Sequence, residues 1–226
     1  MSILNRIQID CQTCGAEAPG DLVASVNADR RPDLRQGILD RSFQAVPCPV
    51  CRTPMRLPPR FTYMDIGRGQ WILAHAAPEI ADWQEREQRA QDIFDHAFGA
   101  AASTPARGIG RGLSPRITFG WPALREKLIC REAGLDDVSL ELLKAALLCA
   151  VSDVPFRDDS ELRLDAVEAN ELAFHWLAAS SEASLATLRV PRSAYDSIAD
   201  GTDDWADLRT TLAAGLLVDL QRLLAA

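Results

Sequence analysis

Two short motifs, Cys11-Gln-Thr-Cys14-Gly15 and Pro47-Cys48-Pro49-Val50-Cys51, determine how the first part of this chain folds. Each contains two cysteines separated by two residues. Two such pairs in one short stretch are typical of a tetrahedral metal site with four thiolate ligands. Both sulfurs of a pair reach one ion only if the backbone turns tightly, and Gly15 and Pro49 favour such turns. The sequence therefore predicts one metal site, formed by Cys11, Cys14, Cys48 and Cys51.

The ion that suits these ligands best is Zn²⁺, one per chain, because zinc is tetrahedral, borderline-soft and commonly held by four cysteines. A site closed by four thiolates has no open coordination position, so we expect it to support the fold. Disulfides are disfavoured in a reducing compartment, and a thioredoxin-like redox motif needs one pair at a strand-to-helix turn. Redox chemistry and iron stay open as alternatives, because C-x-x-C-G followed by C-P-x-C also resembles the rubredoxin ligand pattern.

The second motif departs from the first at its end, where Arg52 takes the position that Gly15 has in the first. A non-glycine residue there costs roughly 1–2 kcal/mol if its backbone is left-handed. Structural zinc contributes roughly 10–16 kcal/mol in small peptides, so the site can offset that strain.

Composition and charge narrow the class of protein. The chain has 226 residues, of which 47% are hydrophobic and 25% charged, as in ordinary globular domains. Its apolar stretches are shorter than the roughly 18 residues of a membrane span, and residues 1–6 lack a secretory signal pattern. We therefore expect a soluble, cytoplasmic protein without membrane association.

The net charge of −8 is unevenly distributed along the chain. Residues 1–125 carry 15 basic and 13 acidic side chains, a net charge of +2, whereas residues 126–226 carry 9 and 19, a net charge of −10. Nucleic-acid binding requires clustered positive charge, so this distribution disfavours it. The alternative of a nucleic-acid-associated zinc ribbon would use four arginines near the first motif: Arg30, Arg31, Arg35 and Arg41.

Hydrophobic alternation predicts a zinc-ribbon-like β domain over residues 1–80, with one helix inserted between the cysteine pairs. The helix is expected to begin at Asp33 as its N-cap, with apolar residues at helical spacing up to residue 39. The expected strands cover residues 3–10, 21–27, 41–46 and 55–57, followed by a hairpin of 61–66 and 70–74.

Beyond the cysteines, residues 9–78 resemble the CpXC domain of bacterial proteins. The resemblance includes Ser25-Val-Asn27, Arg31-Pro-Asp-Leu34, Phe43-Gln44, Phe61-x-Tyr63-x-Asp65 and Gln70-Trp71. Later segments resemble the C-terminal extension of many such proteins, namely Phe119-Gly-x-x-Ala-Leu-Arg-Glu-Lys127, Ala133-Gly-Leu-Asp-Asp137 and Glu141-Leu-Leu-Lys144. The resemblance implies that Cys11, Cys14, Cys48 and Cys51 bind metal, and it implies no particular activity.

The rest of the chain predicts a connecting helix, a linker and a second domain. Residues 83–98 read as the helix, residues 99–115 as a flexible linker rich in glycine and proline, and the whole connection covers residues 81–115. The pattern of residues 116–226 predicts an α+β domain. Its expected elements are a helical hairpin (122–133 and 138–151), a small antiparallel sheet (162–167, 172–176 and 185–190) and a short helix (195–199). A last helix, capped by Asp204, is expected from residue 205 to residue 223, where leucines recur every three or four positions. The overall fold class is therefore α+β.

No catalytic or cofactor-binding residues are predicted beyond the metal ligands. Cys130 and Cys149 are expected to pack in the core, and no spacing connects a cysteine to His75, His96 or His175. The sequence contains no G-x-S-x-G, H-E-x-x-H or P-loop motif. We expect a non-enzymatic zinc-binding protein that acts as an interaction or adaptor module for protein partners.

Overall fold

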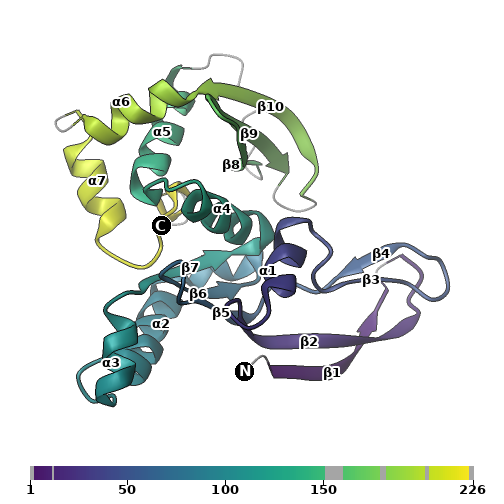
Figure 1. Cartoon of the computed structure of the whole chain (residues 1–226). Helices are drawn as coiled ribbons and strands as arrows, with labels where there is room; N and C mark the ends of the chain where they lie inside the picture. Colours follow the sequence, from purple (N-terminus) through teal and green to yellow (C-terminus); the bar gives the residue numbers. More distant parts are fainter. Residues whose placement is uncertain (1–2, 12, 151–159, 179–181, 202–203, 224–226) are drawn as a thin grey trace. The chain divides into compact units, whose positions relative to one another are not determined.

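The computed structural model describes residues 3–11, 13–150, 160–178, 182–201 and 204–223 (Figure 1). The chain forms two compact units: residues 1–78 with 90–121, and residues 79–89 with 122–226. Both contain helices and antiparallel strand pairs, which confirms the predicted α+β class.

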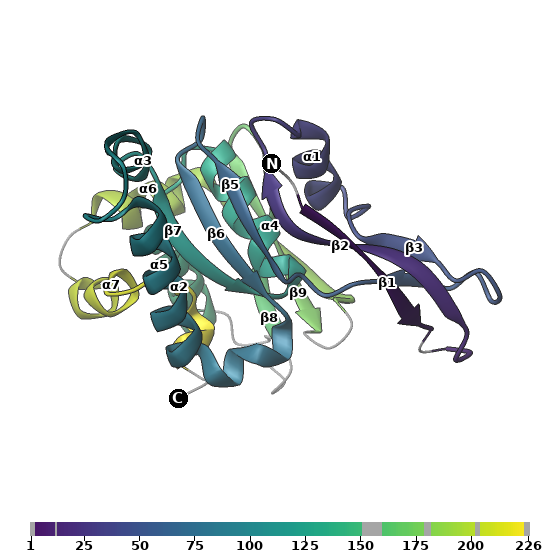
Figure 2. The same ribbon diagram turned by 90° about the horizontal axis from the view of Figure 1, so that it is seen from below.

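The first unit is built on a five-stranded sheet in the order β1-β2-β5-β6-β7. These strands are Ile3–Asp10, Glu17–Asn27, Phe61–Asp65, Gln70–His75 and Ser114–Phe119. β1 pairs with β2 and β5 with β6 in antiparallel register, whereas β2–β5 and β6–β7 are parallel (Figure 2). Helix α1 (Pro32–Leu39) and a two-stranded sheet of β3 (Ala45–Pro47) and β4 (Pro54–Arg56) lie between β2 and β5 in sequence.

An aromatic cluster forms the core of the first unit around Trp121. The Trp121 ring lies 5.8 Å from the rings of both Phe43 and Phe61, and these two meet edge to face at 5.6 Å. The indole N–H donates a 2.9 Å hydrogen bond to the carbonyl of Leu57, so its polar atom is satisfied inside the core. The Arg56 guanidinium lies 4.2 Å from the centre of the same ring.

Polar side chains fix the turns around the first sheet. Asp65 is buried, and its carboxylate accepts hydrogen bonds from the Tyr63 hydroxyl (3.2 Å) and the Arg68 N–H (3.0 Å). The Arg35 guanidinium from α1 lies 3.8 Å from the same carboxylate. Asp29 accepts from the N–H groups of residues 66 and 67 at 2.8 and 2.9 Å, which holds the β5–β6 turn in place.

The second unit places helices beside an antiparallel sheet in the order β10-β9-β8. Its helices are α4 (Gly120–Glu132, which begins in the first unit), α5 (Asp137–Ala150), α6 (Arg192–Asp200) and α7 (Ala206–Ala213). The strands are β8 (Ser160–Val167), β9 (Glu171–Ala178) and β10 (Ser184–Pro191), and η2 (Leu220–Leu223) is a short 3-10 turn. The core contains Leu140, Leu143, Leu164, Phe174 and Trp176.

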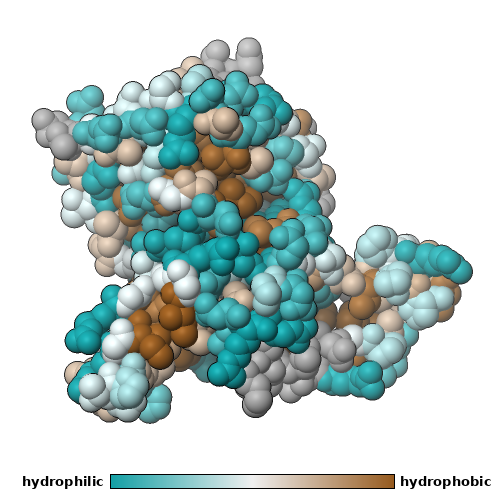
Figure 3. Space-filling model, viewed as in Figure 1, coloured by the Kyte–Doolittle hydropathy of each residue, from teal (hydrophilic) through white to brown (hydrophobic). Residues whose placement is uncertain are grey.

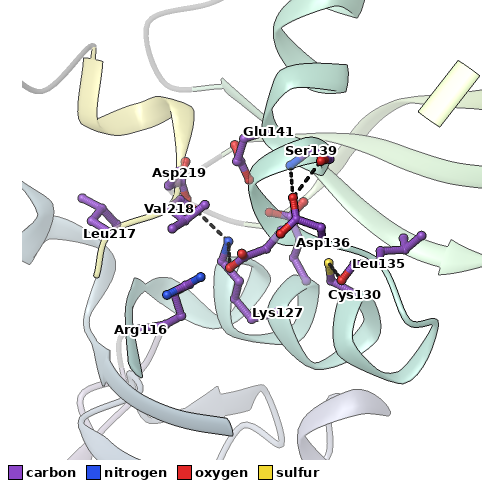
Figure 4. A network of polar contacts seen from close by, with 12 residues as sticks. Arg116, Lys127, Cys130, Leu135, Asp136, Ser139, Glu141, Leu217, Val218 and Asp219 are labelled. Atoms are coloured by element: carbon purple, nitrogen blue, oxygen red, sulfur yellow. Dashed lines mark hydrogen bonds and ion pairs between the residues drawn. The ribbon is translucent and has the colours of Figure 1, made fainter. Parts of the chain in front are cut away.

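Asp136 caps α5. Its carboxylate accepts hydrogen bonds from the N–H (2.8 Å) and hydroxyl (2.7 Å) of Ser139 (Figure 4). The Tyr195 hydroxyl from α6 accepts a 2.7 Å hydrogen bond from the Asp136 N–H, so the start of α5 is hydrogen-bonded to α6.

The expected linker over residues 99–115 differs from the observed structure. Residues 83–98 form α2 as predicted, but α3 (Thr104–Gly110) follows, with the Ser103 hydroxyl accepting from the Ala106 N–H. β7 then joins the first sheet, so residues 90–121 belong to the first unit. Glycine is used here for close packing, since a Cβ at Gly110 would lie 2.5 Å from the Cβ of Phe98.

One helix terminus and one strand were also predicted incorrectly. The N-cap of α1 is Arg31, and Asp33 lies in the first turn, where it pairs with the Arg31 guanidinium at 2.7 Å. The strand expected over residues 41–46 shortens to β3, because Arg41 and Gln44 have positive φ values of 68° and 54°.

The last helix is shorter than its leucine pattern suggests. α7 ends at Ala213, its N-cap is Trp205 rather than Asp204, and the chain continues as η2 after an irregular segment. Gly215 explains the break: its missing side chain leaves room for the Glu87 carboxylate, which accepts from two backbone N–H groups that a continuous helix would use.

Candidate metal centre

Each cysteine pair lies at the tip of a two-stranded ribbon. The first follows β1 and leads into β2, and the second connects β3 to β4. In the first tip the Cys11 N–H donates to the Ala16 carbonyl (2.9 Å), and the Gly15 N–H donates to the Cys11 carbonyl (2.8 Å). The second tip repeats both bonds, from Cys48 to the Thr53 carbonyl (2.9 Å) and from residue 52 back to Cys48 (3.0 Å).

The two tips also share a left-handed residue directly after the second cysteine. Gly15 has φ +71° and Arg52 has φ +62°. The sequence comparison of the two motifs therefore identified the correct position, and the second tip accepts the strain of a side chain there.

The four sulfurs form a compact group. All four Sγ atoms of Cys11, Cys14, Cys48 and Cys51 lie within 4.8 Å of one another. The Cys11–Cys51 and Cys14–Cys48 pairs are each 3.6 Å apart, and all four thiols are free. A tetrahedral Zn²⁺ with bonds of about 2.3 Å requires sulfurs about 3.8 Å apart, so the donor set fits the ion.

Burial divides the four ligands into two classes. Cys11 and Cys48 are buried in a small cluster with Ala18 and Met55, whereas Cys14 and Cys51 are exposed. Two of the four buried members of this cluster are therefore the ligands themselves. The ribbon tips thus have little apolar core of their own.

Hydrogen bonding changes the acidity of these thiols in opposite directions. The hydroxyl and N–H of Thr53 lower the pKa of Cys51 to about 6, and the N–H of Cys51 lowers the pKa of Cys48. The Ala16 N–H lowers the pKa of Cys14, but the side-chain contact with Cys51, desolvation, and the contacts with Cys48 and Cys11 outweigh this effect and raise the pKa to about 12. A thiolate at Cys51 therefore forms more readily than one at Cys14, and a cation bound between the sulfurs would favour the ionised form of both.

The arginines of the nucleic-acid alternative have different surroundings. Arg31 is paired with Asp33, and Arg35 is buried beside Asp65. Arg30 and Arg41 lie at the surface. The carboxylates of Asp33 and Asp65 therefore offset the charge of two of the four arginines, Arg31 and Arg35, which leaves a weaker basic patch than the sequence suggests.

The remaining cysteines and histidines of the sequence analysis lie outside the four-sulfur group. Cys130 is buried in the core of the second unit, as expected, whereas Cys149 is exposed. His75 stacks on Phe119 with ring centres 5.4 Å apart. Among the described residues, the four-sulfur group is the one set of three or more cysteine, histidine or carboxylate side chains close enough to share an ion.

One polar arrangement was missed by the sequence analysis. His175 Nδ1 lies 3.2 Å from the Ser184 hydroxyl, and its Nε2 lies 3.8 Å from the Asp165 carboxylate. The second distance is too long for a hydrogen bond. These residues come from three different strands, so no local motif could have revealed them.

Comparison with known protein families agrees with this geometry. A family model described as CpXC protein matches residues 9–144, which include both ribbon tips. The chain belongs to the CpXC family. Searches of curated proteins and of solved structures returned no match. Within the described residues, no helix is long and apolar enough to cross a membrane.

Proposed function

We propose that this CpXC protein binds one Zn²⁺ through Cys11, Cys14, Cys48 and Cys51, and that the ion has a structural role. The observation that carries the proposal is the 3.6 Å spacing of two sulfur pairs within a group no wider than 4.8 Å. Four thiolates complete the coordination of zinc, so the site has no position for a substrate.

Energetics supports a structural role. β3 and β4 pair over only three residues each, and an isolated hairpin of this kind is marginal in water. Zinc binding of roughly 10–16 kcal/mol exceeds what the small cluster around Met55 can supply. We therefore propose that the second ribbon forms its native turn only when the ion is bound.

Elemental analysis of protein purified without added metal tests the ion directly. We expect one zinc per chain in the native protein and none in Cys48→Ser. The matched control is Cys149→Ser, which removes an exposed thiol outside the site and should keep the zinc. Iron with visible colour would replace this proposal by a rubredoxin-like one, and a folded protein with four titratable thiols and no metal would overturn both.

We also propose that the protein is not an enzyme and acts in the cytoplasm through contacts with protein partners. Four free thiols at the site suit a reducing compartment. Exposed apolar side chains support a protein contact: Val50 at the second tip is 71% exposed, and hydrophobic surface gathers over α2 and α3 (Figure 3), where Ile93 and Ile109 are exposed. The net charge of −8 disfavours nucleic acid.

Chemical cross-linking in cells tests the partner proposal. The expected result is a discrete adduct that weakens in Val50→Asp and persists in Ile66→Asp, a matched change at another exposed apolar residue. If the protein binds single-stranded DNA, duplex DNA or RNA, and this binding weakens steeply as the salt concentration rises, the nucleic-acid alternative would be favoured instead.

A further inference from the structure

The second unit contains a network of charged side chains that the metal site does not involve. Four carboxylates and two cations from α4, α5, β8 and the C-terminal segment lie together in its interior. They are Glu126, Glu141, Glu161, Asp219, Lys144 and Arg163. Glu126 and Glu141 are fully buried at 0% exposure, and the others are at most 8% exposed.

Short ion pairs connect the members of this network. Lys144 Nζ lies 2.9 Å from Glu126 and 2.7 Å from Glu141. Arg163 contacts three carboxylates, those of Glu126 (3.1 Å), Glu161 (2.7 Å) and Asp219 (2.6 Å).

The C-terminal strap, which we define as residues 214–223, is attached to this network by side chains of other elements. The Leu220 N–H donates to Glu141 (3.0 Å), and Lys127 Nζ donates to the Val218 carbonyl (2.6 Å; Figure 4). Asp219 of the strap supplies the carboxylate bound to Arg163. Beside the network, Glu87 accepts from the N–H groups of residues 216 and 217, both at 2.7 Å.

The network holds more negative than positive charge. Its four carboxylates and two cations leave an excess of two negative charges when all are ionised. Lys127 and Asp137 lie 3.1 Å apart and balance each other, so they do not remove this excess. Uncompensated charge in a desolvated interior is unfavourable, and one carboxylate can relieve it by taking a proton.

Glu141 is the carboxylate placed to take that proton, because it is fully buried and shares its partner Lys144 with Glu126, whereas the other three carboxylates all contact Arg163. Burial raises the pKa of Glu141 to about 7; Lys144 and Lys127 oppose this, and Asp219 and Glu126 add to it. Burial also disfavours ionised Asp219, but the nearby Arg163 and Lys144 outweigh it and lower the pKa of Asp219 to about 2. Asp219 on the strap therefore stays charged, whereas Glu141, which accepts the Leu220 N–H of the strap, changes its charge near neutral pH.

We propose that the C-terminal strap is a pH-sensitive latch, docked most firmly when Glu141 is protonated and loosened when Glu141 ionises beside Asp219 and Glu126. Undocking removes the Asp219 carboxylate and admits water to Glu141, so ionisation favours the open state. The strap also supplies Asp219, Leu220 and Gln221 to a small pocket whose other walls include Arg163 and Trp176. Opening of the latch therefore widens this pocket.

Hydrogen exchange of the strap amides in the full-length zinc-loaded protein tests the latch. After correction for the intrinsic pH dependence of exchange, protection of residues 216–220 is expected to fall on the order of 10- to 100-fold between pH 5 and pH 8. Amides of α6 in the same unit should show no such change. In Glu141→Gln the strap should have nearly equal protection at both pH values.

Two further variants keep the test decisive. Glu87→Gln is the matched control, because Glu87 also holds the strap but lies outside the network; it should retain the pH dependence. Asp219→Asn removes one of the opposing charges and should reduce the pH dependence severalfold even if Glu141→Gln fails to fold. Equal protection of the native strap at pH 5 and pH 8, or a full pH dependence in a folded Glu141→Gln or Asp219→Asn, would overturn the proposal.

Discussion

The left-handed backbone of Arg52 allows a quantitative test of the ribbon geometry. Arg52 has φ +62° in the position where the first tip has Gly15 at φ +71°. Left-handed conformation costs a non-glycine residue roughly 1–2 kcal/mol, and glycine escapes that cost but loses roughly 0.5–1 kcal/mol more chain entropy on folding. Arg52→Gly should therefore stabilise the folded tip by about 0.5–1 kcal/mol.

The gain should appear in metal affinity, because the second tip is expected to fold with its ion. About 1 kcal/mol corresponds to about a fivefold tighter apparent zinc affinity, which competition with a chromophoric chelator can measure. Arg52→Ala is the matched control, since it removes the same positive charge but keeps the Cβ. The informative comparison is glycine against alanine at this position.

The reverse change can be made at the first tip, at Gly15. A Cβ at Gly15 would meet no atom within 4 Å, so Gly15→Ala adds backbone strain without a steric clash. It should weaken zinc binding by about the same factor by which Arg52→Gly strengthens it. Equal affinities of Arg52→Gly and Arg52→Ala would show that strain at this backbone position does not limit the site, and the reasoning would be refuted.

Three further predictions concern packing and pH. Trp121→Phe leaves the buried Leu57 carbonyl without its donor and should lower the free energy of unfolding by about 1–3 kcal/mol in urea titrations; an unchanged midpoint would contradict this. Gly110→Ala should lower the melting temperature by overpacking against α2, whereas Gly108→Ala in the same helix, where a Cβ meets nothing, should not; equal shifts would argue against the observed packing of α3. The stability that Glu141 contributes is present below pH 4.5 and is lost as pH rises through about 7, a change of about 3 kcal/mol. Urea denaturation followed in the second unit should therefore give a lower free energy of unfolding at pH 8 than at pH 5. Glu141→Gln should not show this difference.

Much of the first unit was predictable because its signals are local. Alternating apolar residues identified β1, β5 and β6, and the cysteine spacing identified the four sulfurs that the fold gathers. The equivalence of Gly15 and Arg52 was also visible, because both tips obey the same backbone constraint.

The errors lie where distant residues decide the local structure. The leucine spacing after residue 205 is helical, but Glu87, more than a hundred residues earlier, binds the backbone N–H groups at residues 216 and 217 and ends the helix. The glycines of residues 99–115 suggested a linker, yet Gly110 packs closely against α2. Composition describes a segment's own flexibility and contains no information about the surface that receives it.

The buried network shows why the second unit needs the residues beyond the family match. Glu126, Glu141 and Lys144 come from the segments that resemble the CpXC extension and lie within the matched residues 9–144. Two carboxylates and one amine in an apolar interior are unfavourable by themselves. Arg163 of β8 supplies the missing cation, and the Leu220 N–H satisfies a Glu141 oxygen, both from beyond residue 144. Because these polar groups must be paired before they can be buried, α4 and α5 can complete their packing only together with the sheet and the strap. A chain truncated after α5 should therefore expose this face to water rather than retain it as a core, which makes the later residues part of the folding unit and not an appendage to it.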